Sequence, residues 1–146
     1  MPRFFTLSQA EKLLPQVESA IRAAILHKSE FESAESEWQS FSRRLMETGG
    51  MQVDRSRVIA QKNRRESAAN DVKNSIERVE EFGCIVKDLD IGLIDFPTLL
   101  NGQEVYLCWK LGESGIQFWH GVHEGYRGRK AIDDQFLEQH QGELPN

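Results

Sequence analysis

Apolar residues along the first half of the chain recur at steps of three and four, which is the spacing of an amphipathic helix. The first such stripe is interrupted once, by Lys28, and consists of Val17, Ile21, Ala24, Phe31, Ala34, Trp38, Phe41 and Leu45. Gly49 and Gly50 end it. The second stripe is interrupted by Lys62 and Arg65 and consists of Val58, Ala69, Val72, Ile76, Val79 and Phe82, with Gly83 placed as a C-terminal cap. The two stripes predict a long antiparallel helical hairpin over residues 1–83, similar to a coiled coil.

The start of the hairpin contains a proline. Thr6 and Gln9 have the spacing of a capping box, so a helix is expected to begin near Leu7. Pro15 lacks an amide donor and restricts Leu14, which predicts a short first helix followed by a longer one.

Beyond Gly83 the pattern changes to the two-residue period of β-strands. Short β-favouring runs occur at residues 84–86 and 91–96, with Pro97 closing the second. Asn101-Gly102 is a hairpin turn signal between that run and strands expected at 104–111 and 116–120. The predicted fold class is therefore α+β: the hairpin, then a small antiparallel β meander over 84–132 packed with it as one domain. Residues 133–146 carry few apolar anchors and are expected to be a poorly ordered tail.

Composition places the chain among soluble proteins. Of 146 residues, 39% are hydrophobic and 28% charged, and the net charge of -5 argues against holding duplex DNA by overall charge. A secretory signal and an apolar run of about 20 residues are both missing from the sequence, so we expect a cytoplasmic protein with no membrane partner. Cys84 and Cys108 are too far apart in sequence for a CxxC motif and are expected to be buried, reduced thiols.

Basic residues cluster near the predicted hairpin tip. Seven of the 18 lie there: Arg43, Arg44, Arg55, Arg57, Lys62, Arg64 and Arg65. Such a cluster, and Arg55, Arg57, Arg64 and Arg65 above all, suits an RNA backbone or an acidic partner. Acidic residues interleave and no aromatic stacking pattern accompanies the charges, so solvated helix surface is the favoured interpretation, and nucleic acid is not the expected partner.

The rear region gathers residues of the types that bind zinc or another first-row divalent metal. They are Asp88, Asp90, Asp95, His120, His123 and Glu124. His120 and His123 form an HxxH pair without the glutamate of the HExxH motif, so a metal site is one hypothesis. The competing one places the aspartates in turns and His120 as a hydrogen-bonded side chain at the end of a strand.

A second candidate site lies in the segment from Gly125 to Lys130. Arg127, Arg129 and Lys130 stand among glycines, which favours an anion clamp for phosphate or carboxylate. The alternative is that the glycines permit a turn and that Arg129 pairs with a nearby acidic residue.

Several motifs together resemble the domain-of-unknown-function family DUF2203. They are the runs 83–97, 104–113, 118–120 and 125–129, with Phe4-Phe5-Thr6-Leu7, Ala10 and Leu13-Leu14-Pro15 at the start. The resemblance reaches about residue 130 and implies a small bacterial protein with a helical hairpin and a compact β region. It brings no established activity or catalytic residue. His123 departs from the family pattern, which has an acidic residue at that position.

These observations lead to three functional hypotheses. The first is a homo-oligomeric interaction or assembly protein that forms a homodimer through the long helices, because the predicted hairpin is longer than a small β region needs for coverage. The second is a metal-binding protein or a small metal-dependent hydrolase using His120, His123 and nearby carboxylates. The third is RNA binding through the basic tip.

Overall fold

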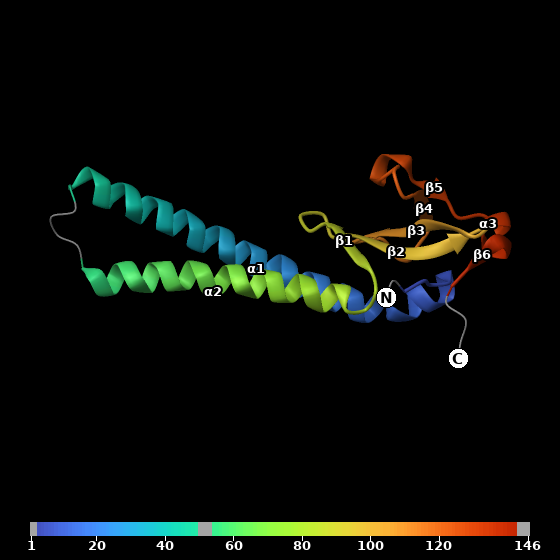
Figure 1. The fold of residues 1–146 in the computed structure, drawn as a ribbon, viewed down its shortest axis with the longest axis horizontal. Helices are drawn as coiled ribbons and strands as arrows, with labels where there is room; N and C mark the ends of the chain where they lie inside the picture. The colour runs from blue at the N-terminus through green and yellow to red at the C-terminus, as the bar shows by residue number, and fades with distance from the viewer. Residues whose placement is uncertain (1–2, 50–53, 143–146) are drawn as a thin grey trace.

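The computed structural model describes residues 3–49 and 54–142, which form a helical hairpin followed by a β-sheet (Figure 1). Helix α1 spans Leu7–Glu47 and helix α2 spans Arg55–Glu80. They run antiparallel and pack against one another, and an antiparallel meander follows, so the predicted α+β class is confirmed. Gly49 has a φ of 66°, as a residue leaving a helix requires, whereas Gly50 lies outside the described residues.

Helix α1 begins at the predicted capping box and then continues unbroken. The Thr6 side chain accepts from the Gln9 amide while the Gln9 side chain accepts from the Thr6 amide. Pro15 lies inside the helix, so the prediction of two separate helices is wrong. The buried residues Leu14 and Val17 lie on either side of the proline, and their packing stabilises a helix that local preference alone would interrupt.

The sheet follows the order β1-β2-β3-β4-β5, with β6 also paired to β2. Strand β1 spans Ile85–Asp88, β2 spans Leu93–Leu100, β3 spans Gln103–Lys110 and β4 spans Phe118–Gly121. Asn101 and Gly102 join β2 to β3 with φ values of 53° and 81°. Positive φ at both central residues is the type I′ geometry that Asn-Gly favours, and it fixes the register of the two strands.

Strand β2 continues through Pro97, which we expected to close it. The backbone N and O atoms of one strand residue point to the same neighbouring strand. The Pro97 carbonyl accepts from the Phe5 amide at 2.8 Å on the side of β2 that faces away from β3, so the Pro97 nitrogen also points to that side. Strands β1 and β6 pair with other parts of that side, at residues 93–95 and 99–100. The missing amide hydrogen of Pro97 therefore costs no ladder hydrogen bond.

The segment after β4 forms two short helices and two short strands, and the strands pair with the sheet. They are the 3-10 helix Tyr126–Gly128, β5 (Lys130–Ala131), α3 (Asp134–Gln139) and β6 (His140–Gln141). Residues 133–142 were expected to belong to a poorly ordered tail, yet they form α3 and β6. Phe136 is buried and packs against Trp119, so one aromatic residue supplies the anchor. Residues 143–146 lie outside the described residues.

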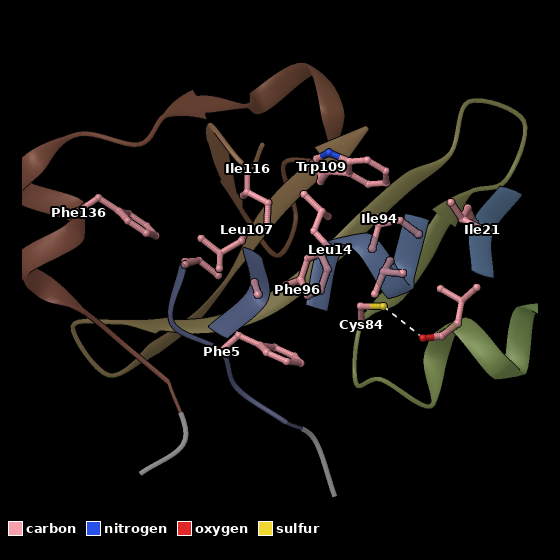
Figure 2. Packing of buried hydrophobic residues seen from close by; sticks show 14 residues of the cluster. Phe5, Leu14, Ile21, Cys84, Ile94, Phe96, Leu107, Trp109, Ile116 and Phe136 are labelled. Carbon is pink, nitrogen blue, oxygen red and sulfur yellow. Dashed lines mark hydrogen bonds between the residues drawn. The ribbon is translucent and has the colours of Figure 1, made fainter. Parts of the chain in front are cut away.

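The core lies between one face of the sheet and the first half of α1 (Figure 2). Ile94, Phe96, Leu107 and Trp109 share that face because alternate residues of a strand point to the same side. Cys84 closes one end of the core, where its thiol donates to the Val79 carbonyl. In the described part of the chain, no helix is apolar over enough of its length to span a membrane.

The second half of the hairpin extends beyond the sheet (Figure 1). Lys28, which interrupts the first apolar stripe, forms an ion pair with Asp90 in the turn between β1 and β2. This contact explains the interruption, since Lys28 lies where the hairpin meets the sheet. Beyond it, the buried residues of α1 are Ala34 and Phe41.

Candidate metal centre

Three neighbouring strands bring an aspartate, a cysteine and a histidine together on the face of the sheet opposite the core. Asp95 of β2 pairs directly with Cys108 of β3. His120 of β4 pairs with Tyr106, two residues before Cys108 on the same face. The exposed fractions of Asp95, Cys108 and His120 are 0, 0 and 2%. Three polar or ionisable side chains are thus buried side by side.

The hydrogen bonds of His120 define what lies between it and Asp95. The Nδ1 atom is 2.8 Å from the Gly121 carbonyl oxygen, which only accepts, so Nδ1 carries a hydrogen and donates it. The Nε2 atom is 3.0 Å from Asp95 Oδ1. In a neutral imidazole with its hydrogen on Nδ1, a lone pair on Nε2 faces a carboxylate oxygen. Either a proton or a metal ion must separate these two atoms.

The other carboxylate oxygen of Asp95 is also informative. Oδ2 is buried, and among the described residues it has no hydrogen-bond partner. A buried carboxylate oxygen without a partner is costly, by about 1–3 kcal/mol or more. The Asp95 Oδ2 atom without a partner and the His120 Nε2 lone pair that faces Oδ1 therefore belong to the same cluster.

Cys108 completes the cluster as a protonated thiol in the absence of a metal. Burial raises the pKa of the Cys108 thiol to about 12, and the negative charge of Asp95 acts in the same direction. A thiol with so high a pKa and no exposed surface is a poor nucleophile. It becomes a strong ligand once a metal ion displaces its proton.

The cluster fits one zinc-class ion. Its three ligand atoms all lie within 4.8 Å of one another. Two atoms bound to a tetrahedral zinc ion at bond lengths of about 2.0–2.3 Å lie roughly 3.3–3.7 Å apart, so the Nε2–Oδ1 distance of 3.0 Å would lengthen slightly around such an ion. The Nδ1 hydrogen bond of His120 to a backbone carbonyl is the outer contact that orients most metal-bound histidines. Among the described residues, the group contains no fourth protein ligand.

The structure separates the predicted metal residues. Asp95 and His120 meet, whereas Asp88, Asp90, His123 and Glu124 are exposed and lie outside the cluster. Asp88 accepts from the Asp90 amide at 2.9 Å, as in a turn. Glu124 accepts from Lys130 and from the Gly121 amide, and these hydrogen bonds lower the pKa of its carboxyl.

Sequence reasoning did not include Cys108 among the candidate ligands and treated it as a buried, reduced thiol. The signal that identifies it is the Asn101-Gly102 turn. A two-residue turn at these positions places residues whose numbers sum to 203 opposite one another, and Asp95 with Cys108 is such a pair.

The candidate anion site is largely neutralised by internal ion pairs. One guanidinium nitrogen of Arg129 donates to both carboxylate oxygens of Glu113, at 2.8 and 2.7 Å. The Lys130 ammonium donates to both oxygens of Glu124, at 2.7 and 2.9 Å. Arg127 is exposed. Two of the three cations of the predicted clamp therefore already have carboxylate partners.

The basic hairpin tip shows similar pairing. Arg64 forms an ion pair with Glu37, and Arg65 with Glu35, both across the two helices. Arg57 lies over the Phe41 ring at 5.4 Å, and Arg55 is exposed. These contacts fit the interpretation of the tip as helix surface.

Comparison with known proteins identifies the family. Residues 3–132 match the family described as uncharacterized conserved protein (DUF2203), so the chain belongs to it, as the sequence motifs predicted. The matched range contains the three residues of the candidate metal centre. No curated protein and no solved structure matches the chain.

Proposed function

We propose that this protein binds a zinc-class divalent metal ion through Asp95, Cys108 and His120. The observation that carries the proposal is the buried His120 Nε2 facing Asp95 Oδ1 at 3.0 Å, with Asp95 Oδ2 unpartnered in the described structure. Aspartate, cysteine and histidine are all ligands of zinc, and the mixed donor set disfavours magnesium and calcium, which prefer oxygen. A divalent ion bound between them would offset the buried carboxylate charge and accept the Nε2 lone pair of His120.

The role that fits this position is structural. The three ligands come from β2, β3 and β4, so one ion would cross-link three adjacent strands. Exposed fractions of 2% or less argue against a hydrolase, because a substrate must reach a metal-bound water to be cleaved. Metal binding rather than metal-dependent hydrolysis is therefore the proposed activity.

Elemental analysis of the purified, untagged protein after expression in zinc-supplemented medium tests the proposal. We expect about one zinc per chain in the wild type, and replacement by Co²⁺ to give the absorption of a cobalt–thiolate bond. Cys108→Ser should remove that absorption, and His120→Ala should abolish stoichiometric metal. Circular dichroism verifies that each variant retains its helices.

The chain supplies a matched control in its other cysteine. Cys84 is also buried, with a pKa raised by burial to about 12, but it lies outside the cluster. Cys84→Ser should keep both the metal and the cobalt–thiolate absorption. Wild-type protein that stays metal-free after supplementation, or folded His120→Ala that keeps full metal, overturns the proposal. The cluster would then be a hydrogen-bonded pair in which His120 and Asp95 share a proton.

The hairpin favours a second candidate function, homo-oligomeric assembly. Leu26, Met46 and Ile59 are large apolar side chains on the two helices, and they are 59, 83 and 58% exposed. The hairpin extends well beyond the sheet, so a second copy of the hairpin would cover such side chains where the sheet does not. Light scattering tests it: a homodimer has twice the chain mass of 16.8 kDa, and a mass of 16.8 kDa across micromolar concentrations contradicts assembly.

A further inference from the structure

One stripe on the outer face of α1 carries an exposed leucine between opposite charges. Arg22 lies one turn before Leu26 and Glu30 lies one turn after it. Residues four apart share a helix face, so the three side chains form a line from positive through apolar to negative. All three are exposed, and Leu26 is 59% exposed.

The charges on this stripe have only weak partners within the chain. Arg22 pairs with Glu18 on the same helix at 3.0 Å, and Glu30 lies 3.7 Å from His27. Exposed pairs of this kind contribute between nothing and about 1 kcal/mol, so both charges remain able to pair elsewhere.

Beside the stripe is an apolar groove between the two helices. It has a volume of about 490 Å³, and its lining includes Ala20, Ala23 and Phe82. Ala23 is one turn from Leu26, so a protruding apolar side chain and an apolar groove occupy the same side of the hairpin. Small residues at positions 19, 23 and 33 allow a second helix to approach this side closely.

We propose that a second copy of this chain docks on this surface, with its α1 antiparallel to the first across a two-fold axis at Leu26. This inference rests on the proposed assembly function and names the surface. In a two-fold interface the same patch occurs on both partners and must complement itself. An antiparallel crossing at Leu26 places Arg22 of each copy opposite Glu30 of the other, with the two leucines between them.

The order of charges is what favours a second copy over another partner. The basic residue lies four positions before the leucine and the acidic residue lies four positions after it. When a second, reversed copy of the helix is placed alongside, the basic residue of each copy therefore lies opposite the acidic residue of the other. The arrangement thus supplies two identical ion pairs on either side of the paired leucines.

Charge exchange in the full-length protein tests the surface, with the dimer dissociation constant measured by analytical ultracentrifugation. Arg22→Glu and Glu30→Arg each place like charges together at two symmetric positions, and each should raise the dissociation constant on the order of tenfold. The double exchange restores both pairs and should return the constant to near its wild-type value. Leu26→Ala, which favours helix, should weaken the dimer at least about tenfold without loss of helix content.

Matched controls separate this surface from overall charge. Lys73→Glu and Glu66→Arg, both at exposed positions of α2, make the same charge changes elsewhere and should leave the constant unchanged. A dimer that is insensitive to Leu26→Ala and to both exchanges overturns this surface while assembly stands. A monomer at all concentrations overturns both.

Discussion

Arg129 and Glu113 form a largely buried ion pair beside the candidate metal centre. The Arg129 side chain is 10% exposed and that of Glu113 is 22% exposed, and the guanidinium also lies 4.1 Å from the centre of the Phe118 ring. Glu113 accepts from the Lys110 amide as well, at 2.6 Å. The pair therefore joins the β3–β4 turn to the segment that leads to β5.

Removing Arg129 should destabilise the protein strongly. Arg129→Ala leaves the Glu113 carboxylate without its cation and uncovers Phe118, and loss of one partner of a buried pair costs about 3 kcal/mol. Urea unfolding measures the loss. Arg127→Ala, at a neighbouring exposed position, should change the free energy of unfolding by less than about 0.5 kcal/mol. Equal effects of the two variants contradict this account.

Both thiols should resist alkylation in the folded protein. In the metal-free protein, burial raises the pKa values of Cys84 and Cys108 to about 12, so almost no thiolate exists at neutral pH, and both side chains are buried. Iodoacetamide at pH 8 should label neither cysteine until urea unfolds the chain, and mass spectrometry counts the labels. Labelling of the native protein at the rate of the unfolded chain would contradict the burial.

The same pKa shifts predict instability at high pH. An unfolded thiol loses its proton near 9.0, whereas folded Cys84 retains it up to about 12, so the unfolded chain binds fewer protons in this interval. Between these two values, Cys84 alone should lower the free energy of unfolding by about 1.4 kcal/mol per pH unit. Urea titrations between pH 8 and 11 measure the slope. Cys84→Ala should make it shallower, and an unchanged slope would refute the assignment.

His140 should matter for stability but not for metal binding. Its Nε2 accepts from the Leu7 amide at 3.0 Å, and its ring stacks on Phe136 at 5.2 Å. His140→Ala leaves that amide without its acceptor, which should cost about 1–2 kcal/mol in urea unfolding while the metal content stays at the wild-type value. His123→Ala, at an exposed position, should alter neither quantity.

The helices and the central strands could be predicted because their patterns are local. Steps of three and four gave the hairpin, and alternation around Asn101-Gly102 gave β2 and β3. The errors came from tertiary contacts that override local preference. Pro15 is held inside α1 by the packing of residues on both sides of it. Pro97 remains in β2 because no backbone carbonyl of a neighbouring strand requires a hydrogen bond from its nitrogen.

The candidate site was predictable only in part. Asp95 and His120 have side chains typical of metal ligands, but nothing in their sequence spacing says that they meet. Their contact depends on the pairing of β3 with β4, whose register is set by the longer connection between Lys110 and Phe118. Cys108 was predictable from the tight turn and was overlooked because a lone cysteine in a strand fits a core position equally well.

The pairing of Leu7 with His140 also affects the order in which the protein folds. These residues are 133 positions apart, and Phe5 similarly hydrogen-bonds to Pro97. During synthesis the hairpin is complete before the strands that cover Leu14 are made, so the side of α1 that faces the sheet is uncovered in the nascent chain at that stage. Contacts of such long range make folding slow relative to that of a simple helical bundle. The sheet-facing side of α1 is therefore buried only after the strands have been made.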